Sequence, residues 1–140
     1  KASCSKGVTC SSNCGYISSL NYPDVYPVSS DCSWTIKGQI GQYVEASFLQ
    51  LDVLGSDECD GDFVRLYDEG LTEERHSLGK FCRDRRPISN INTNWNEMAV
   101  EFYSDFDETS SGFMLRYELK TIRLQNNTVI GDLGRNNEIK

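Results

Sequence analysis

Apolar and polar residues alternate over several short stretches of this chain, as they do in half-buried β-strands. In the stretch FVRLY (63–67), Val64 and Leu66 face one way in an extended segment, and the other three side chains face the opposite way. A short strand is expected after Cys14, ahead of a loop that two prolines punctuate. The same alternation predicts strands at Cys32–Ile36, Val44–Phe48, Leu78–Phe81, Met98–Phe102 and Phe113–Tyr117.

Many short strands and no helical pattern predict an all-β fold, a two-layer antiparallel β-sandwich. A length of 140 residues suits one domain with a sizeable core. We expect a polar N-terminal flap over residues 1–13, a sandwich body over residues 14–119 and a C-terminal extension or linker over residues 120–140. The extension carries an N-glycosylation sequon at Asn126.

The cysteines indicate an oxidising compartment. The chain has 6 cysteines and 1 histidine, and no two cysteines have CxxC spacing, which favours disulfides over zinc or redox sites. Cys4 and Cys10 would close a small loop within the flap, or cross-link it to a neighbouring domain. We therefore expect a secreted protein or the extracellular part of a membrane protein. No signal peptide or apolar run of about 20 residues is present, so we expect a mature or excised product.

Charge narrows the class of partner. The formal net charge is −7, and no basic stripe of the kind that binds nucleic acid is visible. Four acids, Asp57, Glu58, Asp60 and Asp62, crowd the segment around Cys59. Their mutual repulsion must be screened by solvent or relieved by a cation. Cationic partners are expected, either calcium or a protein that presents lysine or arginine.

Taken in order and spacing, a set of short motifs resembles the CUB domain family over about residues 14–119. The motifs are Cys14-Gly15, Ser19-Leu20-Asn21-Tyr22-Pro23, Tyr26-Pro27, Cys32-Ser33-Trp34-Thr35-Ile36, Leu51-Asp52, Asp62-Phe63-Val64, Tyr67-Asp68, Gly79-Lys80-Phe81-Cys82, Phe102-Tyr103-Ser104-Asp105 and Gly112-Phe113. The resemblance implies a CUB-type jelly roll stapled by Cys14–Cys32 and Cys59–Cys82. It leaves Cys4 to pair with Cys10, in agreement with their local spacing.

Many members of this family bind calcium at one end of the sandwich, through three carboxylates from separate loops. The resemblance places Asp62 at the second ligand position and Asp105 at the third, with Tyr26 as the tyrosine that supports the site. The first position is Leu54, whose side chain offers no oxygen. A site with two carboxylates should bind calcium more weakly.

Two interpretations of this end stay open. A nearby acid, Asp57, Glu58 or Asp52, could replace the missing ligand and give a calcium site. The alternative is a calcium-free CUB domain in which Asp62 and Asp105 are solvated. In calcium-binding members the same acids also clasp a lysine of the partner.

Catalytic chemistry is not indicated. A nucleophilic site needs a base held beside a nucleophile, and His76 lies in a polar stretch that suggests a solvated surface residue. Trp34 lies at a core-facing strand position and is expected to pack. Trp95, in an Asn-rich loop, is expected to pack too, with sugar stacking as the alternative. We expect no enzymatic activity.

The sequence therefore favours an extracellular protein-interaction module, one CUB unit of a larger protein. Its binding end would carry Tyr26, Asp57, Asp62 and Asp105 and would favour a basic partner surface. Two alternatives remain: a stand-alone secreted glycan-binding protein of the spermadhesin kind, and a non-catalytic domain of an astacin-like or complement-type protease.

Overall fold

A computed structural model describes residues 4–69, 75–125 and 128–130, with the side chains of 123–125 and 128–130 left aside. The described strands are β1 (Val8–Ser11), β2 (Cys14–Ser18), β3 (Asp31–Lys37), β4 (Gln42–Asp52), β5 (Phe63–Glu69), β6 (Arg75–Phe81), β7 (Ile91–Asn92), β8 (Glu97–Tyr103), β9 (Gly112–Thr121), β10 (Arg123–Gln125) and β11 (Thr128–Ile130). No α-helix occurs in the described ranges, and none of their segments forms a helix able to cross a membrane.

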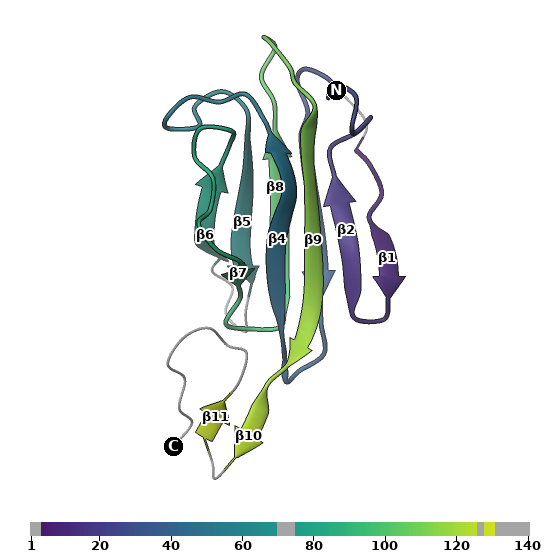
Figure 1. Ribbon diagram of the computed structural model, residues 1–140, viewed down its shortest axis with the longest axis vertical. Coiled ribbons are helices and arrows are strands. Elements are labelled where there is room, and N and C mark those ends of the chain that lie inside the picture. The colour runs from purple at the N-terminus through teal and green to yellow at the C-terminus, as the bar shows by residue number, and fades with distance from the viewer. Residues whose placement is uncertain (1–3, 70–74, 126–127, 131–140) are drawn as a thin grey trace.

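The strands form two antiparallel layers, which confirms the predicted sandwich (Figure 1). One layer has the strand order β1-β2-β9-β4-β7, and the other has the order β3-β8-β5-β6. The strands β10 and β11 pair only with each other. All of the strands expected from alternation are present, although β6 begins at Arg75 and so includes His76, which we expected in a loop.

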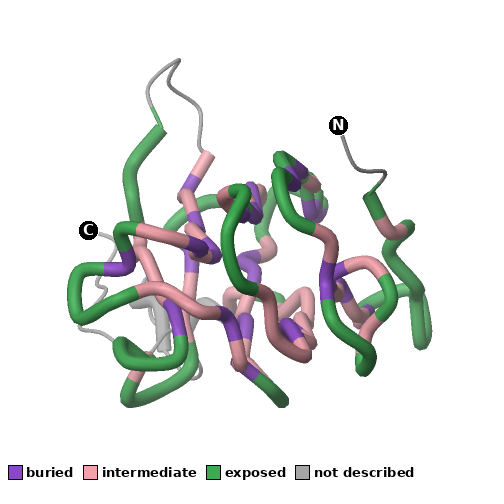
Figure 2. Tube along the Cα trace, turned by 90° about the horizontal axis from the view of Figure 1, so that it is seen from above, coloured by how far each residue is buried: buried purple, intermediate pink, exposed green. Residues whose placement is uncertain are grey.

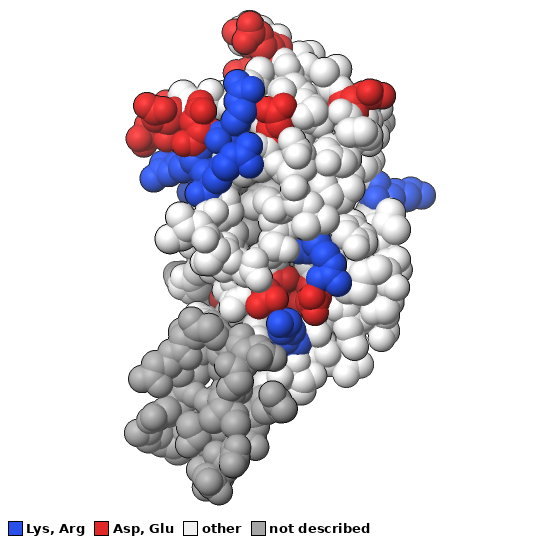
Figure 3. All heavy atoms as spheres, in the orientation of Figure 1, with Lys and Arg blue, Asp and Glu red and all other residues white. Residues whose placement is uncertain are grey.

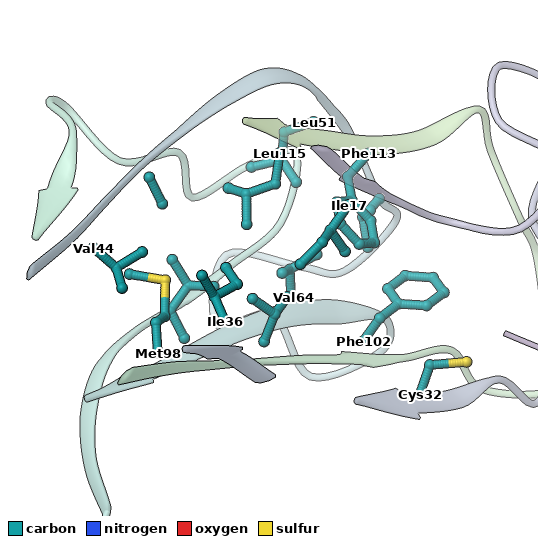
Figure 4. Close-up of a cluster of buried hydrophobic side chains, with 14 of the residues drawn as sticks. Ile17, Cys32, Ile36, Val44, Leu51, Val64, Met98, Phe102, Phe113 and Leu115 are labelled. Atoms are coloured by element: carbon teal, nitrogen blue, oxygen red, sulfur yellow. The ribbon is translucent and has the colours of Figure 1, made fainter. Parts of the chain in front are cut away.

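The core lies between the two layers. Figure 2 shows buried positions inside the molecule and long exposed stretches at its periphery, and the burial patterns of β2, β5 and β8 place buried residues along the strands. Figure 4 shows side chains of β2, β4 and β9 meeting those of β3, β5 and β8 across the gap. Alternation explains this arrangement, since Val64 and Leu66 on β5 are fully buried and their neighbours on that strand are partly exposed. Trp34 packs against this core as expected, and its indole nitrogen donates to the carbonyl of Ser5.

The disulfides differ in part from the expected pairing. Cys59–Cys82 is confirmed, but Cys14–Cys32 and Cys4–Cys10 are wrong: Cys4 pairs with Cys32, and Cys10 pairs with Cys14. The physical reason is a β-hairpin.

Residues 8–18 form that hairpin, in which β1 is an edge strand of the five-stranded layer. Ser11 lies opposite Cys14 in the register, and a bulge lies between Thr9 and Ser11, so Cys10 meets Cys14 across the turn. The segment before the hairpin then runs beside β3 and brings Cys4 to Cys32.

This pairing can be checked directly. We expect digestion of the non-reduced protein to release one disulfide-linked peptide pair with Cys4 and Cys32 and another with Cys59 and Cys82. Cys10 and Cys14, which are four residues apart, should be linked to each other within one peptide. Mass spectrometry that found Cys14 linked to Cys32 would contradict the hairpin geometry.

Candidate functional site

Three loops meet at the end of the sandwich that Figure 1 shows at the top. They are the β2–β3 loop (19–30), the β4–β5 loop (53–62) and the β8–β9 loop (104–111). Backbone bonds join the first loop to the last: Tyr26 donates to the carbonyl of Ser110 at 3.0 Å, and Ser29 donates to the carbonyl of Asp105 at 2.7 Å. We call these three loops the loop end.

The carboxylate of Asp62 is the centre of this end. Asp62 is fully buried, and each of its oxygens accepts a hydrogen bond from another loop. The hydroxyl of Tyr26 donates to Oδ2 at 2.5 Å, and the backbone N–H of Asp105 donates to Oδ1 at 2.8 Å. The same tyrosine oxygen accepts the backbone N–H of Leu54 at 3.0 Å. One buried carboxylate therefore connects all three loops.

Burial raises the pKa of Asp62 to about 6, and the hydrogen bonds from Tyr26 and Asp105 oppose that rise without cancelling it. Burial, followed by the bond to Asp62, also raises the pKa of Tyr26 well above its ordinary value, so Tyr26 stays a neutral donor.

This shift predicts a pH dependence of stability. Between about pH 4 and pH 6 the folded protein holds a proton that the unfolded chain has released, so the contribution of Asp62 to the free energy of unfolding falls as pH rises. The contribution is complete below about pH 4 and lost above about pH 6. With about 1.4 kcal/mol per pKa unit and a rise from 3.8 to about 6, we expect a loss of about 3 kcal/mol.

Urea unfolding at several pH values measures this loss in the wild type. The Asp62→Asn variant should not show it, because asparagine does not titrate. Asp107→Asn is the control, because Asp107 is an exposed acid in the same region. The bond from Ser110 lowers the pKa of Asp52, and the bond from Arg116 lowers the pKa of Glu118. Their effects on the free energy of unfolding fall mainly below this pH window and are the same in all three proteins. Equal slopes for wild type and Asp62→Asn would contradict the prediction.

The other acids proposed as calcium ligands are engaged elsewhere or exposed. Asp52 accepts bonds from Ser110 and Ser111 through Oδ2 and pairs with Arg83 at 3.2 Å through Oδ1. Asp57 and Glu58 are exposed, and Glu58 lies 3.7 Å from Arg85. Figure 3 shows acidic and basic side chains side by side in this region, at the upper left.

The residues present do not fit a calcium site of three carboxylates. Both oxygens of Asp62 already accept hydrogen bonds, and the backbone carbonyl of Leu54 accepts the N–H of Asp62. Asp105 has one oxygen bonded to the N–H of Asp107, and its other oxygen lies against Gly61. In the described ranges no three His, Cys, Asp or Glu residues are grouped as metal ligands. Calcium prefers six to eight oxygens, and the family ligand positions that keep a carboxylate here are Asp62 and Asp105, with Leu54 at the first position.

The predicted binding residues thus fall into two groups. Tyr26 and Asp62 are buried, so they support the loops and cannot touch a partner directly. Asp57 is exposed and Asp105 is partly exposed.

The sequence did not single out Phe106, which is 86% exposed between Asp105 and Asp107, or Val28, which is 43% exposed on the adjoining loop. An apolar residue inside an acidic turn was the available signal.

Other predicted residues lie away from this end. His76 is exposed on β6. Trp95 is 44% exposed in the loop before β8, so the expectation that it packs was wrong, because its loop carries it outward while the neighbouring Thr93 is buried. Asn126 lies outside the described residues.

Comparison with known proteins identifies the family. The family model of the CUB domain matches residues 4–117, so the match begins ten residues before the boundary we expected. Rat cubilin is 36% identical over 118 residues, 84% of this chain and 3% of that protein. Mouse procollagen C-endopeptidase enhancer 2 is 31% identical over 76% of this chain and 26% of that protein, and mouse tolloid-like protein 2 is 30% identical over 84% of this chain and 12% of that protein.

Solved structures agree with this match. The full extracellular region of zebrafish Gpr126/Adgrg6 superposes with a TM-score of 0.69 at 30% identity, over 86% of this chain and 15% of that one. The MASP-1 CUB2 domain bound to Ca²⁺ superposes with a TM-score of 0.67 at 29% identity, over 82% of this chain and 99% of that one. Paired cysteines and relatives of this kind place the chain outside the cytosol. The chain is a member of the CUB domain family.

Proposed function

We propose that this CUB domain is a non-catalytic protein-interaction module that binds a basic partner surface through its loop end. The observation that carries the proposal is the exposed Phe106, set among acids on loops that a buried carboxylate connects. An exposed aromatic ring offers apolar contact area, and the acids Asp105 and Asp107 beside it, with the exposed Asp57 on the β4–β5 loop, favour a lysine- or arginine-bearing partner.

Several features support binding over catalysis. CUB domains are in general non-catalytic modules, and the chain spans only a small part of the relatives it matches. His76 lies on a solvent-facing strand position. In the described part of the chain, the buried carboxylates of Asp62 and Asp68 each bond a backbone N–H, as structural groups do.

The proposed interaction does not depend on calcium. We expect the melting temperature to change by less than about 1 °C between millimolar calcium and chelator, because the hydrogen-bonded Asp62 connects the loops without a metal. A rise of several degrees in calcium, absent from Asp105→Ala, would contradict this.

Surface variants test the binding role. We expect a soluble basic extracellular partner, identified by screening the chain against purified ectodomains, to lose binding when Phe106→Ser is combined with Asp107→Lys. Both residues are exposed, so the melting temperature should not change. Charge reversal at Asp62 would be a poor test, because a buried lysine there would disturb the fold.

A matched control combines an exposed apolar residue and an exposed acid away from the loop end. The pair is Ile40→Ser with Asp84→Lys: both positions are exposed and lie outside the three loops of the loop end, Ile40 being 90% exposed. Unchanged binding by the Phe106 and Asp107 variant would remove the proposal.

A second candidate rests on the relatives. Two kinds of curated relative are tolloid-like protein 2 and the procollagen C-endopeptidase enhancers. This similarity favours a role as a non-catalytic domain that positions a substrate for a secreted protease. Faster cleavage of a matrix precursor by such a protease when this chain is added would support the role. If the variant Phe106→Ser with Asp107→Lys lost this acceleration, the loop end would be the surface responsible.

A further inference from the structure

The outward face of β5, β6 and β8 carries a continuous set of aromatic and cationic side chains. Phe63 and Tyr103 lie opposite each other in the register and stack with their ring centroids 5.5 Å apart. Lys80 lies 4.5 Å from the centre of the Phe63 ring. Further along the same face, Arg75 lies 4.1 Å and Arg65 5.5 Å from the ring of Tyr67.

Arg65 and Lys80 are direct cross-strand neighbours on this face. Like charges in this position repel each other. No ion pair to either residue is found in the described ranges, although Arg75 pairs with Glu69 and Arg85 with Glu58. The Nε of Arg65 reaches only the hydroxyl of Ser77, at 3.5 Å. Both cations lie over aromatic rings, and Glu101 lies opposite Arg65 on β8.

A shallow hollow opens beside this pair. Arg65, Ser77, Lys80 and Arg85 line it, together with the acids Glu58 and Asp60 of the β4–β5 loop. Gly79 also lines it; this residue has φ +145°, and an added Cβ would clash with the Phe81 ring, so the position requires glycine. Arginine, serine and ammonium donors converge on a space wide enough for a carboxylate.

We propose that the outward face of β5 and β6 binds an acidic segment of a partner protein, with one partner carboxylate seated between Arg65 and Lys80. Phe63, Tyr67 and Tyr103 would supply the apolar contact area around that carboxylate. Tyrosine and arginine are the residue types that dominate the binding energy of protein interfaces. Arg65 and Lys80 lie on strands rather than on the loop end, although Glu58 and Asp60 of the β4–β5 loop line the same hollow.

A protein segment fits this face better than a sulfated glycan. The cations are few, and Glu58, Asp60, Glu69 and Glu101 lie around or within them. A dense polyanion would meet more of these acids than a single carboxylate seated between Arg65 and Lys80 would. The net charge of −7 also disfavours the binding of a dense polyanion.

Chemical-shift mapping of the ¹⁵N-labelled chain tests the proposal. The probe is a capped peptide with one glutamate flanked by tyrosines, and the same peptide with glutamine in place of glutamate is its neutral counterpart. At low salt, and at peptide concentrations from micromolar to millimolar, we expect the glutamate peptide to shift the amide resonances of residues 63–67 and 77–80. The glutamine peptide should bind at least about tenfold more weakly.

Variants assign the contact. Arg65→Ala and Lys80→Ala should each weaken binding by about tenfold, because each removes one charged donor. Asp60→Asn should strengthen binding a few-fold, because it removes a repelling acid. Lys37→Ala is the matched control: Lys37 is an exposed cation on the far strand of the same layer, and its loss changes net charge equally.

Three results would overturn the proposal: equal binding of the two peptides, shifts confined to other residues, and binding of a heparin-derived oligosaccharide without binding of the peptide. None of these bears on Phe106 and Asp107, so the loop-end proposal can fail or hold independently.

Discussion

Phe113→Ala is expected to lower the free energy of unfolding by about 3–5 kcal/mol, the range for large aromatic truncations in a core. Phe113 is fully buried on β9 and lies among three other aromatic rings. Its ring centroid is 5.3 Å from that of Phe102, 6.1 Å from Trp34 and 6.4 Å from Phe48. These rings come from both layers, so the truncation would leave a cavity where the layers meet. Urea unfolding of the purified protein measures the change.

Phe106→Ala is the matched control, because Phe106 is 86% exposed. It should change the free energy of unfolding by less than about 0.5 kcal/mol, as surface substitutions commonly do. Similar losses for both variants would mean that Phe113 does not occupy the centre of the core.

Tyr26→Phe is expected to cost about 2–4 kcal/mol at neutral pH, although it removes a single oxygen. That oxygen donates to Asp62 and accepts from the N–H of Leu54, and the variant leaves both groups without their partner. A lost hydrogen bond to a charged group costs about 1.5–3 kcal/mol, and a buried unpaired donor about 1–3 kcal/mol. The pKa of Asp62 should rise further, because the Tyr26 bond holds it down. Thermal and urea unfolding at pH 7 and pH 5 measure both effects.

Tyr103→Phe is the control for this variant. Tyr103 is 40% exposed, and its ring stacks on Phe63, an interaction that phenylalanine preserves. It should be close to neutral. A Tyr26→Phe protein as stable as Tyr103→Phe would show that the loop end does not depend on the Asp62 network.

Strand positions could be predicted because alternation records burial residue by residue. Val64 and Leu66, or Met98 and Phe102, needed only their period of two to be placed in the core. The order of the family motifs then fixed the sandwich. Trp34 was assigned correctly on the same grounds.

The N-terminal pairing could not be predicted in this way. All four residues of β1 are exposed, so its sequence has no alternation of apolar and polar residues from which a strand could be predicted. The hairpin of β1 and β2 was therefore not predicted. Cys14 was taken as the start of the fold, whereas the family match and the disulfide to Cys32 both involve Cys4. The separation of 4 residues between Cys10 and Cys14 was the available signal, because it suits a turn.

The burial of Asp62 also could not be predicted from the sequence. A carboxylate in an acidic loop suggests solvent or metal, and its two donors come from residues 36 and 43 positions away. Only the fold brings Tyr26 and Asp105 to it. The same limit applies to Arg65 and Lys80, whose adjacency depends on the register of β5 and β6.

Three loops fastened to one buried carboxylate have a kinetic consequence. The amides of Leu54 and Asp105 are in loops, yet their bonds to Tyr26 and Asp62 should protect them from hydrogen exchange as strand amides are protected. A loop end fixed in this manner has little conformational entropy left to lose on association. Its association rate would then depend mainly on charge steering at first encounter, and would fall steeply as salt is added.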